Sequence, residues 1–552
     1  MGKVNIKKYF LNGKSEKDRK IFYKLIDICF DFINGRTRGG KVLVYHKPDF
    51  FKRLLSGESL PQKPIDYKTG FKLLKEISKY SISQADVNYL AFPDADNSIP
   101  GLMAEILSKF LNQNLIAFDR SAPIATFIEI QLIEWLRGLI GYGGKNLKEI
   151  NSLSKVSGMW TTGGHMSNHI ATMTALNYKF DFIKGKGLTS LKKPPKIVLA
   201  DKISHYSWSA AMHHLGLGNE NIINCDTNED FTTNVESLEN ILKNHPDKKS
   251  IFMVVGVAGN TRTSGIDDLL GISRICKKYK VWFHVDACHG GSLIFSRKLK
   301  NMYLKGISQA DSISLDPHKG MFVTYPSSYI LFKKRDSLVK FTRYEDHVRQ
   351  GTSWDLGYIT PFFGSRGFES LKLWFLIKML GVKGLAEVAE KRHEDAQYAA
   401  KLIFDSKLFS VFHQMTFYRM VFVYYPEEIK NFISDNKLKK EDLLQIKKCV
   451  DFYTHRLNQE LYEEGNICLD EFKLHDLADI TKLKAGEDRF VVMSITIGNP
   501  LFTKKSLKRS INYLLEAARK YTPTMKKDIC KIIQKGKYDV REVKTYGPAG
   551  WK

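Results

Sequence analysis

Residues 281–291 read Val-Trp-Phe-His-Val-Asp-Ala-Cys-His-Gly-Gly, an apolar run with an aspartate near its end and two glycines after it. The apolar part, Val281–Ala287, predicts a buried β-strand. Asp286 then stands at the carboxyl end of a strand, where a parallel sheet places its binding cleft. The ordinary alternative is that Asp286 caps a turn or a helix, a common use of aspartate near glycine.

Strand-like runs alternate with helical patterns on both sides of this stretch, up to about residue 335. A helical pattern over Ile266–Cys276, for example, lies between two of the runs. This alternation predicts an α/β fold with a mostly parallel sheet that is covered on both faces. The predicted strands are Lys196–Ala200, Ile251–Val257, Val281–Ala287, Ser312–Leu315 and Ser328–Phe332.

The length of the chain, 552 residues, is too great for one ordinary core and predicts several domains. A long helix is predicted over 368–403, turning at Gly381 and Gly384. The expected parts are a helical N-terminal segment over 1–100, a large domain over 101–385, a small α/β domain over 386–520 with strands near Val411–Tyr425 and Phe490–Ile497, and a basic extension over 521–552.

The formal charge of +26 comes from lysines and arginines that are spread along the chain. This spread predicts a solvated basic surface and no specific nucleic-acid partner. Seven scattered cysteines, with no CxxC and no histidine partners at metal spacing, predict reduced thiols, a cytoplasmic protein and no metal site. There is no apolar run of bilayer length and no signal-peptide core at the N-terminus, so no membrane partner is expected.

A lysine follows the next predicted strand at a comparable place. Asp316-Pro317-His318-Lys319-Gly320 comes directly after Ser312–Leu315. A lysine in a turn is usually a solvated surface residue. Here the strand end and the proline would hold the amine of Lys319 in the same cleft as Asp286. A partly buried amine is expected to have a lowered pKa and to form imines.

A third element is Thr162-Gly163-Gly164-His165, which opens a helical pattern. Glycines at the start of a helix let backbone N–H groups approach an anion. A Gly-Gly turn by itself occurs at many strand–helix joints. Together with a cleft lysine and a cleft aspartate, it meets the needs of pyridoxal 5′-phosphate (PLP): a phosphate cradle, a Schiff-base lysine and a carboxylate for the ring nitrogen.

This ordered set of motifs resembles the group II PLP-dependent amino-acid decarboxylases, the family of the glutamate, aromatic-amino-acid and tyrosine decarboxylases. The resemblance covers about residues 95 to 520. It implies PLP fold type I with a seven-stranded sheet, a homodimer, and decarboxylation of an aromatic or acidic L-amino acid. The matching stretches are Gly163-Gly164, Leu199–Leu217, His284–Gly291, Asp316–Lys319, Gly364–Phe368, Ser370–Leu385 and Ile497–Leu501.

The resemblance also implies roles for single residues. Lys319 would hold the cofactor as a Schiff base, Asp286 would pair with the ring nitrogen, and His205 would stack on the ring. Tyr344, in a loop after Lys319, would return a proton to the substrate, with Tyr358 as the competing candidate. The residues expected to bind the cofactor are Gly163, Gly164, His165, His205, Thr261, Asp286, Ala287, Asp316, His318 and Lys319.

Two departures from the family pattern bear on the site. Asp316 stands where many members have asparagine, so its charge near a phosphate requires a compensating donor. Phe92–Ser98 replaces a His-Pro segment that helps to shape the substrate pocket, which leaves the substrate open.

Other classes of protein share some of these features. The Asp286–Gly291 motif also resembles the sphingosine-phosphate lyases, so a PLP-dependent carbon–carbon lyase is the alternative enzyme. The His318-Lys319 pair weighs against an aminotransferase. A basic nucleic-acid-binding or inactive scaffold protein is the alternative outside enzymes, and the presence of both Lys319 and Asp286 argues against it.

Overall fold

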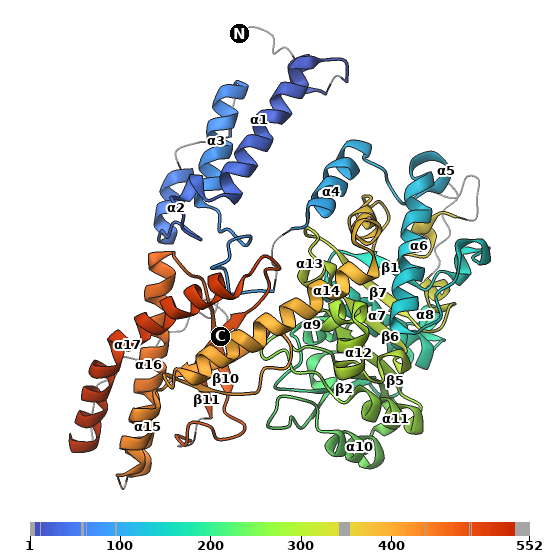
Figure 1. Cartoon of the computed structure of the whole chain (residues 1–552). Helices are drawn as coiled ribbons and strands as arrows, with labels where there is room; N and C mark the ends of the chain where they lie inside the picture. Colours follow the sequence, from blue (N-terminus) through green and yellow to red (C-terminus); the bar gives the residue numbers. More distant parts are fainter. Residues whose placement is uncertain are drawn as a thin grey trace.

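The computed structural model places a large α/β domain beside a smaller C-terminal domain, with a group of N-terminal helices on the outside (Figure 1). One long helix, α14 (Ser370–Asp405), runs from the large domain towards the C-terminal helices. The structure describes residues 6–535 apart from Asn12, 57–59, Gln62, 94–96, 342–353, Lys437, Ala485 and Glu487.

Within the described residues, the large domain is built on a seven-stranded sheet of order β1-β7-β6-β5-β4-β2-β3. The five neighbouring strands β3, β2, β4, β5 and β6 run parallel to one another. Strands β7 and β1 complete the sheet with antiparallel pairings. The predicted mostly parallel sheet is confirmed. The bounds are β1 Gly158–Thr161, β2 Lys196–Ala200, β3 Ile222–Cys225, β4 Ile251–Val257, β5 Trp282–Ala287, β6 Ser312–Leu315 and β7 Ser328–Phe332.

The central strands are buried on both faces. All seven residues of β4 are buried. Because successive side chains of a strand point to opposite faces, helices must cover the sheet on both sides. Helix α7, Gly164–Lys179, follows β1 and packs on β4, β5, β6 and β7. Helix α11, Leu269–Tyr279, packs on β4 and β5.

The C-terminal domain contains an antiparallel sheet of order β10-β11-β9-β8 in the described part of the chain. Helix α16, Lys440–Glu464, packs on this sheet and on α17, Lys504–Lys535. Helix α17 continues past residue 520, where the sequence suggested that a separate basic extension begins. The strands are β8 Phe409–Val411, β9 Arg419–Tyr424, β10 Asp470–His475 and β11 Arg489–Thr496.

The N-terminal helices α1, Glu16–Ile33, and α3, Tyr67–Tyr80, pack against each other. The chain between them reaches the C-terminal domain, where the Val42 N–H donates to the Gly465 carbonyl at 2.8 Å. None of the helices in the described residues is both long and apolar enough to cross a lipid bilayer.

Helix α14, Ser370–Asp405, confirms the predicted long helix and its break at Gly381. Gly381 has φ 64° and ψ 174°, a conformation open almost only to glycine, and it kinks the helix there. Gly384, the other predicted turning point, keeps helical dihedral angles.

A buried lysine ties α14 to α4, Ile99–Leu111. Lys372 is fully buried, and its Nζ lies 2.9 Å from Glu105 and 2.7 Å from Glu369. The same amine donates to the carbonyl oxygens of Thr324 (3.1 Å) and Pro326 (3.0 Å). A buried charge is stable only when it is paired and hydrogen-bonded, and this network meets both needs. It also fixes the backbone on either side of Tyr325.

Candidate active site

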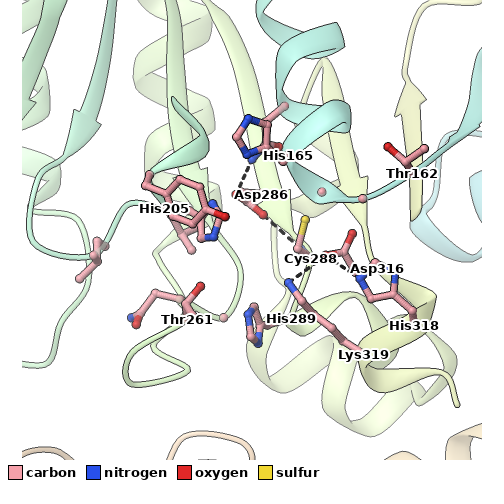
Figure 2. A pocket seen from close by; sticks show the side chains of 18 of the residues that line it. Thr162, His165, His205, Thr261, Asp286, Cys288, His289, Asp316, His318 and Lys319 are labelled. Carbon is pink, nitrogen blue, oxygen red and sulfur yellow. Dashed lines mark hydrogen bonds and ion pairs between the residues drawn. The ribbon is translucent and has the colours of Figure 1, made fainter. Parts of the chain in front are cut away.

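The carboxyl ends of β4, β5 and β6 meet at a cavity of about 210 Å³. This is the edge at which open α/β sheets bind their ligands. Figure 2 shows Asp286, Cys288, Asp316 and Lys319 close together, with His205 towards the other side of the view. The predicted cleft that contains both Asp286 and Lys319 is therefore present.

Asp286 enters the cavity from the end of β5 and is held by three donors. The Asn168 amide donates to Oδ2 at 2.9 Å. The Cys288 N–H (3.2 Å) and the Ser314 hydroxyl (3.4 Å) donate to Oδ1. The carboxylate is buried, so these contacts fix its direction.

Lys319 lies on the single turn α13, Pro317–Gly320, and its Nζ contacts Asp316 Oδ2 at 2.8 Å. Burial alone would lower the pKa of Lys319, but the attraction of Asp316, with smaller contributions from Cys288 and Asp286, outweighs it and raises the pKa above its usual value. The expected lowering of the lysine pKa is therefore wrong. The expectation considered burial and not the carboxylate three residues earlier.

Asp316 has the compensating donors that the sequence called for. Burial would raise the pKa of Asp316, but the Lys319 charge and the His318 ring hold it well below its usual range. The Ser328 hydroxyl also donates to this carboxylate. His318 Nε2 lies 3.6 Å from Asp316 Oδ2, and the His318 ring stacks on Tyr325 with 3.9 Å between centroids.

Gly163 and Gly164 lead from β1 into α7 along one wall of the cavity. A Cβ on Gly164 would lie 2.3 Å from Cys288 Sγ and 2.9 Å from Asp316 Oδ2. No side chain fits there without displacing these groups. A Cβ on Gly163 would meet no atom within 4 Å. The close approach thus explains one glycine of the pair and not the other.

Several histidines line the cavity as neutral rings. Burial lowers the pKa of His165, His205 and His289. The Ser207 N–H donates to His205 Nδ1 at 3.2 Å and fixes the orientation of that ring. His289 Nδ1 hydrogen-bonds with the Tyr418 hydroxyl, which comes from the C-terminal domain.

Nine of the ten residues expected to bind the cofactor line this cavity. The tenth, Ala287, is not among the lining residues, because it follows Asp286 on β5 and its side chain points to the other face. Tyr344 lies outside the described residues. Tyr358 ends a short 3₁₀ turn, Leu356–Tyr358, and does not line the cavity.

Several lining residues were not assigned a role from the sequence, among them Asn168, Cys288 and Tyr325. Asn168 donates to Asp286, and its own Oδ1 is buried without a hydrogen-bond partner. Its position four residues after Gly164, one turn into the helix, is the only sequence signal for it. Cys288 packs under Gly164, and Tyr325 covers His318.

Comparisons with known proteins point to one family. A family model described as the pyridoxal-dependent decarboxylase conserved domain matches residues 48–425. The chain is 26% identical over 431 residues to a glutamate decarboxylase of Drosophila melanogaster, covering 77% of this chain and 82% of the relative. It is 26% identical over 445 residues to an aromatic-L-amino-acid decarboxylase of Bacillus atrophaeus, covering 79% and 88%.

Solved structures share the fold. Mouse CSAD in its apo form has a TM-score of 0.80 at 20% identity, covering 91% of this chain and 99% of that one. Oryza sativa TDC with PLP and tryptamine has a TM-score of 0.77 at 17% identity, covering 93% and 99%. The predicted fold type I is therefore confirmed. With more than half of its length matched by the family model, the chain belongs to the pyridoxal-dependent decarboxylases, which are carboxy-lyases with PLP as cofactor.

Proposed function

We propose that this enzyme converts an L-amino acid with an aromatic or an acidic side chain to its amine and CO2. We further propose that Lys319 and Asp286 hold the cofactor at the strand ends of the large sheet. The observation that carries the proposal is the convergence of a half-buried lysine, a fixed carboxylate and a glycine-led helix start on one cavity.

The residues present fit PLP. The first N–H groups of α7 have no partner within the helix, and such groups favour a phosphate. Gly164 lets this helix start pack closely on Cys288, since a Cβ there would collide with the Cys288 sulfur. His165 and His318 also line the cavity and would add contacts to the phosphate.

Asp286 would face the pyridine nitrogen of the cofactor. When bound, PLP supplies a ring that accepts electrons from the bond between Cα and the departing carboxylate. A buried carboxylate that Asn168 and Cys288 hold in place favours a positive charge beside it. Asp286 would thereby keep a proton on the ring nitrogen.

Lys319 would be the attachment point of the cofactor. Its raised pKa means that the amine is an ammonium at neutral pH and must lose a proton before it can attack a carbon. The pKa of Asp316 is held below its usual range, so Asp316 is a poor acceptor for that proton. We infer that Asp316 orients the amine by its contact at 2.8 Å.

His205 would stack on the cofactor ring, and Thr261 would lie near the ring hydroxyl. Both line the cavity. The Arg419 guanidinium of the C-terminal domain donates to the Thr261 carbonyl at 2.7 Å, which ties this wall to the second domain. A neutral, oriented His205 offers a flat surface without placing a second charge near the ring.

The proton that replaces CO2 at Cα would come from Tyr344, with Tyr358 as the competing candidate. A phenol can deliver a proton when it is held within hydrogen-bond reach of the accepting carbon. Loops that close over an active site also exclude water from it.

The enzyme would act as a homodimer. Apolar side chains such as Phe30 on α1 and Ile77 on α3 are exposed in the single chain, and a partner subunit would cover them. A cytoplasmic location is consistent with all seven cysteines being free thiols.

Two measurements test the proposal. Borohydride reduction of the PLP-loaded enzyme, followed by peptide mapping, should place the pyridoxyl group on Lys319. Recovery of the group on Lys305 or Lys333 would overturn the assignment. CO2 release from each L-amino acid in turn should identify an aromatic or an acidic substrate, and release from neither class would reject the proposed substrate class.

A further inference from the structure

Three histidines gather beside the cofactor cavity on two packed helices. His165 and His169 lie one turn apart on α7, and His214 is the last residue of α9, Ser207–His214. One ring nitrogen from each lies within 4.8 Å of those of the other two. No metal site was expected from the sequence: His165 and His169 have the i, i+4 spacing of helical metal ligands, but His214, the third histidine, lies far along the chain.

The hydrogen bonds of His169 leave one nitrogen directed at the cluster. His169 Nδ1 lies 2.9 Å from the His165 carbonyl oxygen, to which it can only donate. In the neutral ring, Nε2 then carries the lone pair, and it lies 2.9 Å from His214 Nδ1. A histidine that donates one N–H to a backbone carbonyl and offers its other nitrogen is the usual arrangement of a metal ligand.

We propose that His165, His169 and His214 bind a divalent transition-metal ion of the zinc class. Three imidazoles with a fourth position left for water are a common zinc ligand set. Ligating nitrogens in a tetrahedral zinc site lie about 3.3 Å apart, given zinc–nitrogen bonds of about 2.0–2.1 Å. The 2.9 Å between His169 and His214 must therefore open slightly, and His165 must move inward.

The burial of the three rings permits this adjustment. His169 is buried and held by its carbonyl bond, whereas His165 is half-buried and His214 is exposed. The two rings that must move are thus the two with room to move, and the exposed side of His214 gives an ion a path from solvent. Burial also lowers the pKa of His165 and His169, so both offer a lone pair at neutral pH.

His165 belongs to both sites, since it also lines the cofactor cavity. Metal and cofactor affinities are then coupled, and each ligand changes the affinity for the other by the same factor. The metal site itself does not depend on the proposed substrate or on Lys319.

Cobalt(II) is a suitable probe because its visible bands report its ligands. Titration of the PLP-loaded, tag-free chain should give one bound ion per chain, with the visible bands of four- or five-coordinate cobalt and no thiolate charge-transfer band. Added Zn²⁺ should displace it. Failure to bind cobalt, or a thiolate band from cysteine ligation, would overturn the proposal.

His214→Ala should weaken cobalt binding about tenfold or more. The exposure of His214 makes this change compatible with folding, and retained PLP absorbance would check it. His213→Ala is the matched control, because His213 is the neighbouring exposed histidine on α9. The His213→Ala variant should bind cobalt as tightly as the unchanged chain does. Equal affinity of His214→Ala and the unchanged chain would also overturn the site.

Discussion

In the proposed mechanism, the electron-accepting power of the PLP ring depends on Asp286. In Asp286→Ala, nothing keeps the ring nitrogen protonated, so the rate of CO2 release should fall about a thousandfold, or about 4 kcal/mol of transition-state stabilisation. PLP should still bind, because Lys319 and the start of α7 are unchanged. The measurement is single-turnover CO2 release with PLP absorbance as the occupancy check. Near-normal turnover would contradict the role, and Asp226→Ala, on an exposed loop, is the control.

The two glycines before α7 should respond differently to an added methyl group. Gly164→Ala places a Cβ 2.3 Å from Cys288 Sγ, and such overpacking costs about 1–3 kcal/mol. Gly163→Ala meets no protein atom within 4 Å and has extended backbone. The thermal unfolding midpoint should therefore drop in Gly164→Ala and stay near that of the unchanged chain in Gly163→Ala. Equal midpoints for the two variants would show that Cys288 moves aside without cost.

Tyr344→Phe tests the source of the proton at Cα. The variant should bind PLP and release CO2, but form amine poorly, since the phenylalanine ring has no proton to give. Under air, the unprotonated carbon would react with oxygen to give aldehyde, ammonia and peroxide. Product analysis beside Tyr358→Phe distinguishes the two candidates. An unchanged amine yield from Tyr344→Phe would transfer the role to Tyr358.

Sequence placed most of the site residues correctly in the cavity but missed how they act on one another. Lys319 comes shortly after the end of β6 and Asp286 lies near the end of β5, and both positions are local signals. The pKa of Lys319 depends on the 2.8 Å contact with Asp316, which the turn of α13 creates. The contact between Asn168 and Asp286 joins α7 to β5, and nothing in either stretch alone predicts it.

Strand β5 carries a buried histidine that makes the fold sensitive to acid. Burial lowers the pKa of His284 to about 4, against the opposing attraction of Asp286, whereas an unfolded chain has about 6.5. Between these values the unfolded state binds a proton that the folded state does not. Stability from this site is therefore fully present above about pH 6.5 and falls towards pH 4.

His284→Gln should remove this sensitivity. The unchanged chain should lose about 2 kcal/mol at this site between pH 7 and pH 5, and the variant should lose less over the same interval. Thermal midpoints at the two pH values measure the difference. The exposed-site control is His213→Ala, which should keep the full pH response. The same fall in both variants would mean that His284 is not the source.

How well a strand could be predicted from the sequence depended on how deeply it is buried. Each predicted strand of the large sheet lies within one residue of an observed one, because a run buried on both faces is continuously apolar. Strands β1 and β3 were not predicted. Only one residue of β3 is buried, which fits this rule, whereas β1 is buried along its whole length and is an exception to it. Strand β10, Asp-Glu-Phe-Lys-Leu-His, is largely polar and forms by pairing with β11 at the edge of its sheet.

At the scale of the whole molecule, the charge of +26 should act as a diffuse field. Binding to DNA should be weak, indifferent to base sequence and steeply reduced by salt, because it would come from released counterions. Fluorescence anisotropy with two unrelated duplexes, at low and at physiological salt, measures this. Tight binding to one duplex at physiological salt would mean that the basic surface contains a specific site.

Lys372 and its carboxylates also limit how this enzyme can change over generations. Loss of one partner would leave a buried charge unpaired. The free energy of unfolding would then fall by about 3–5 kcal/mol, which is much of the stability of a domain. Single substitutions at positions 105, 369 and 372 should therefore be selected against. Replacement of all three residues together by apolar residues would be tolerated. Aligned relatives should show these three positions changing together, and lineages that have lost the lysine should have lost the acids as well.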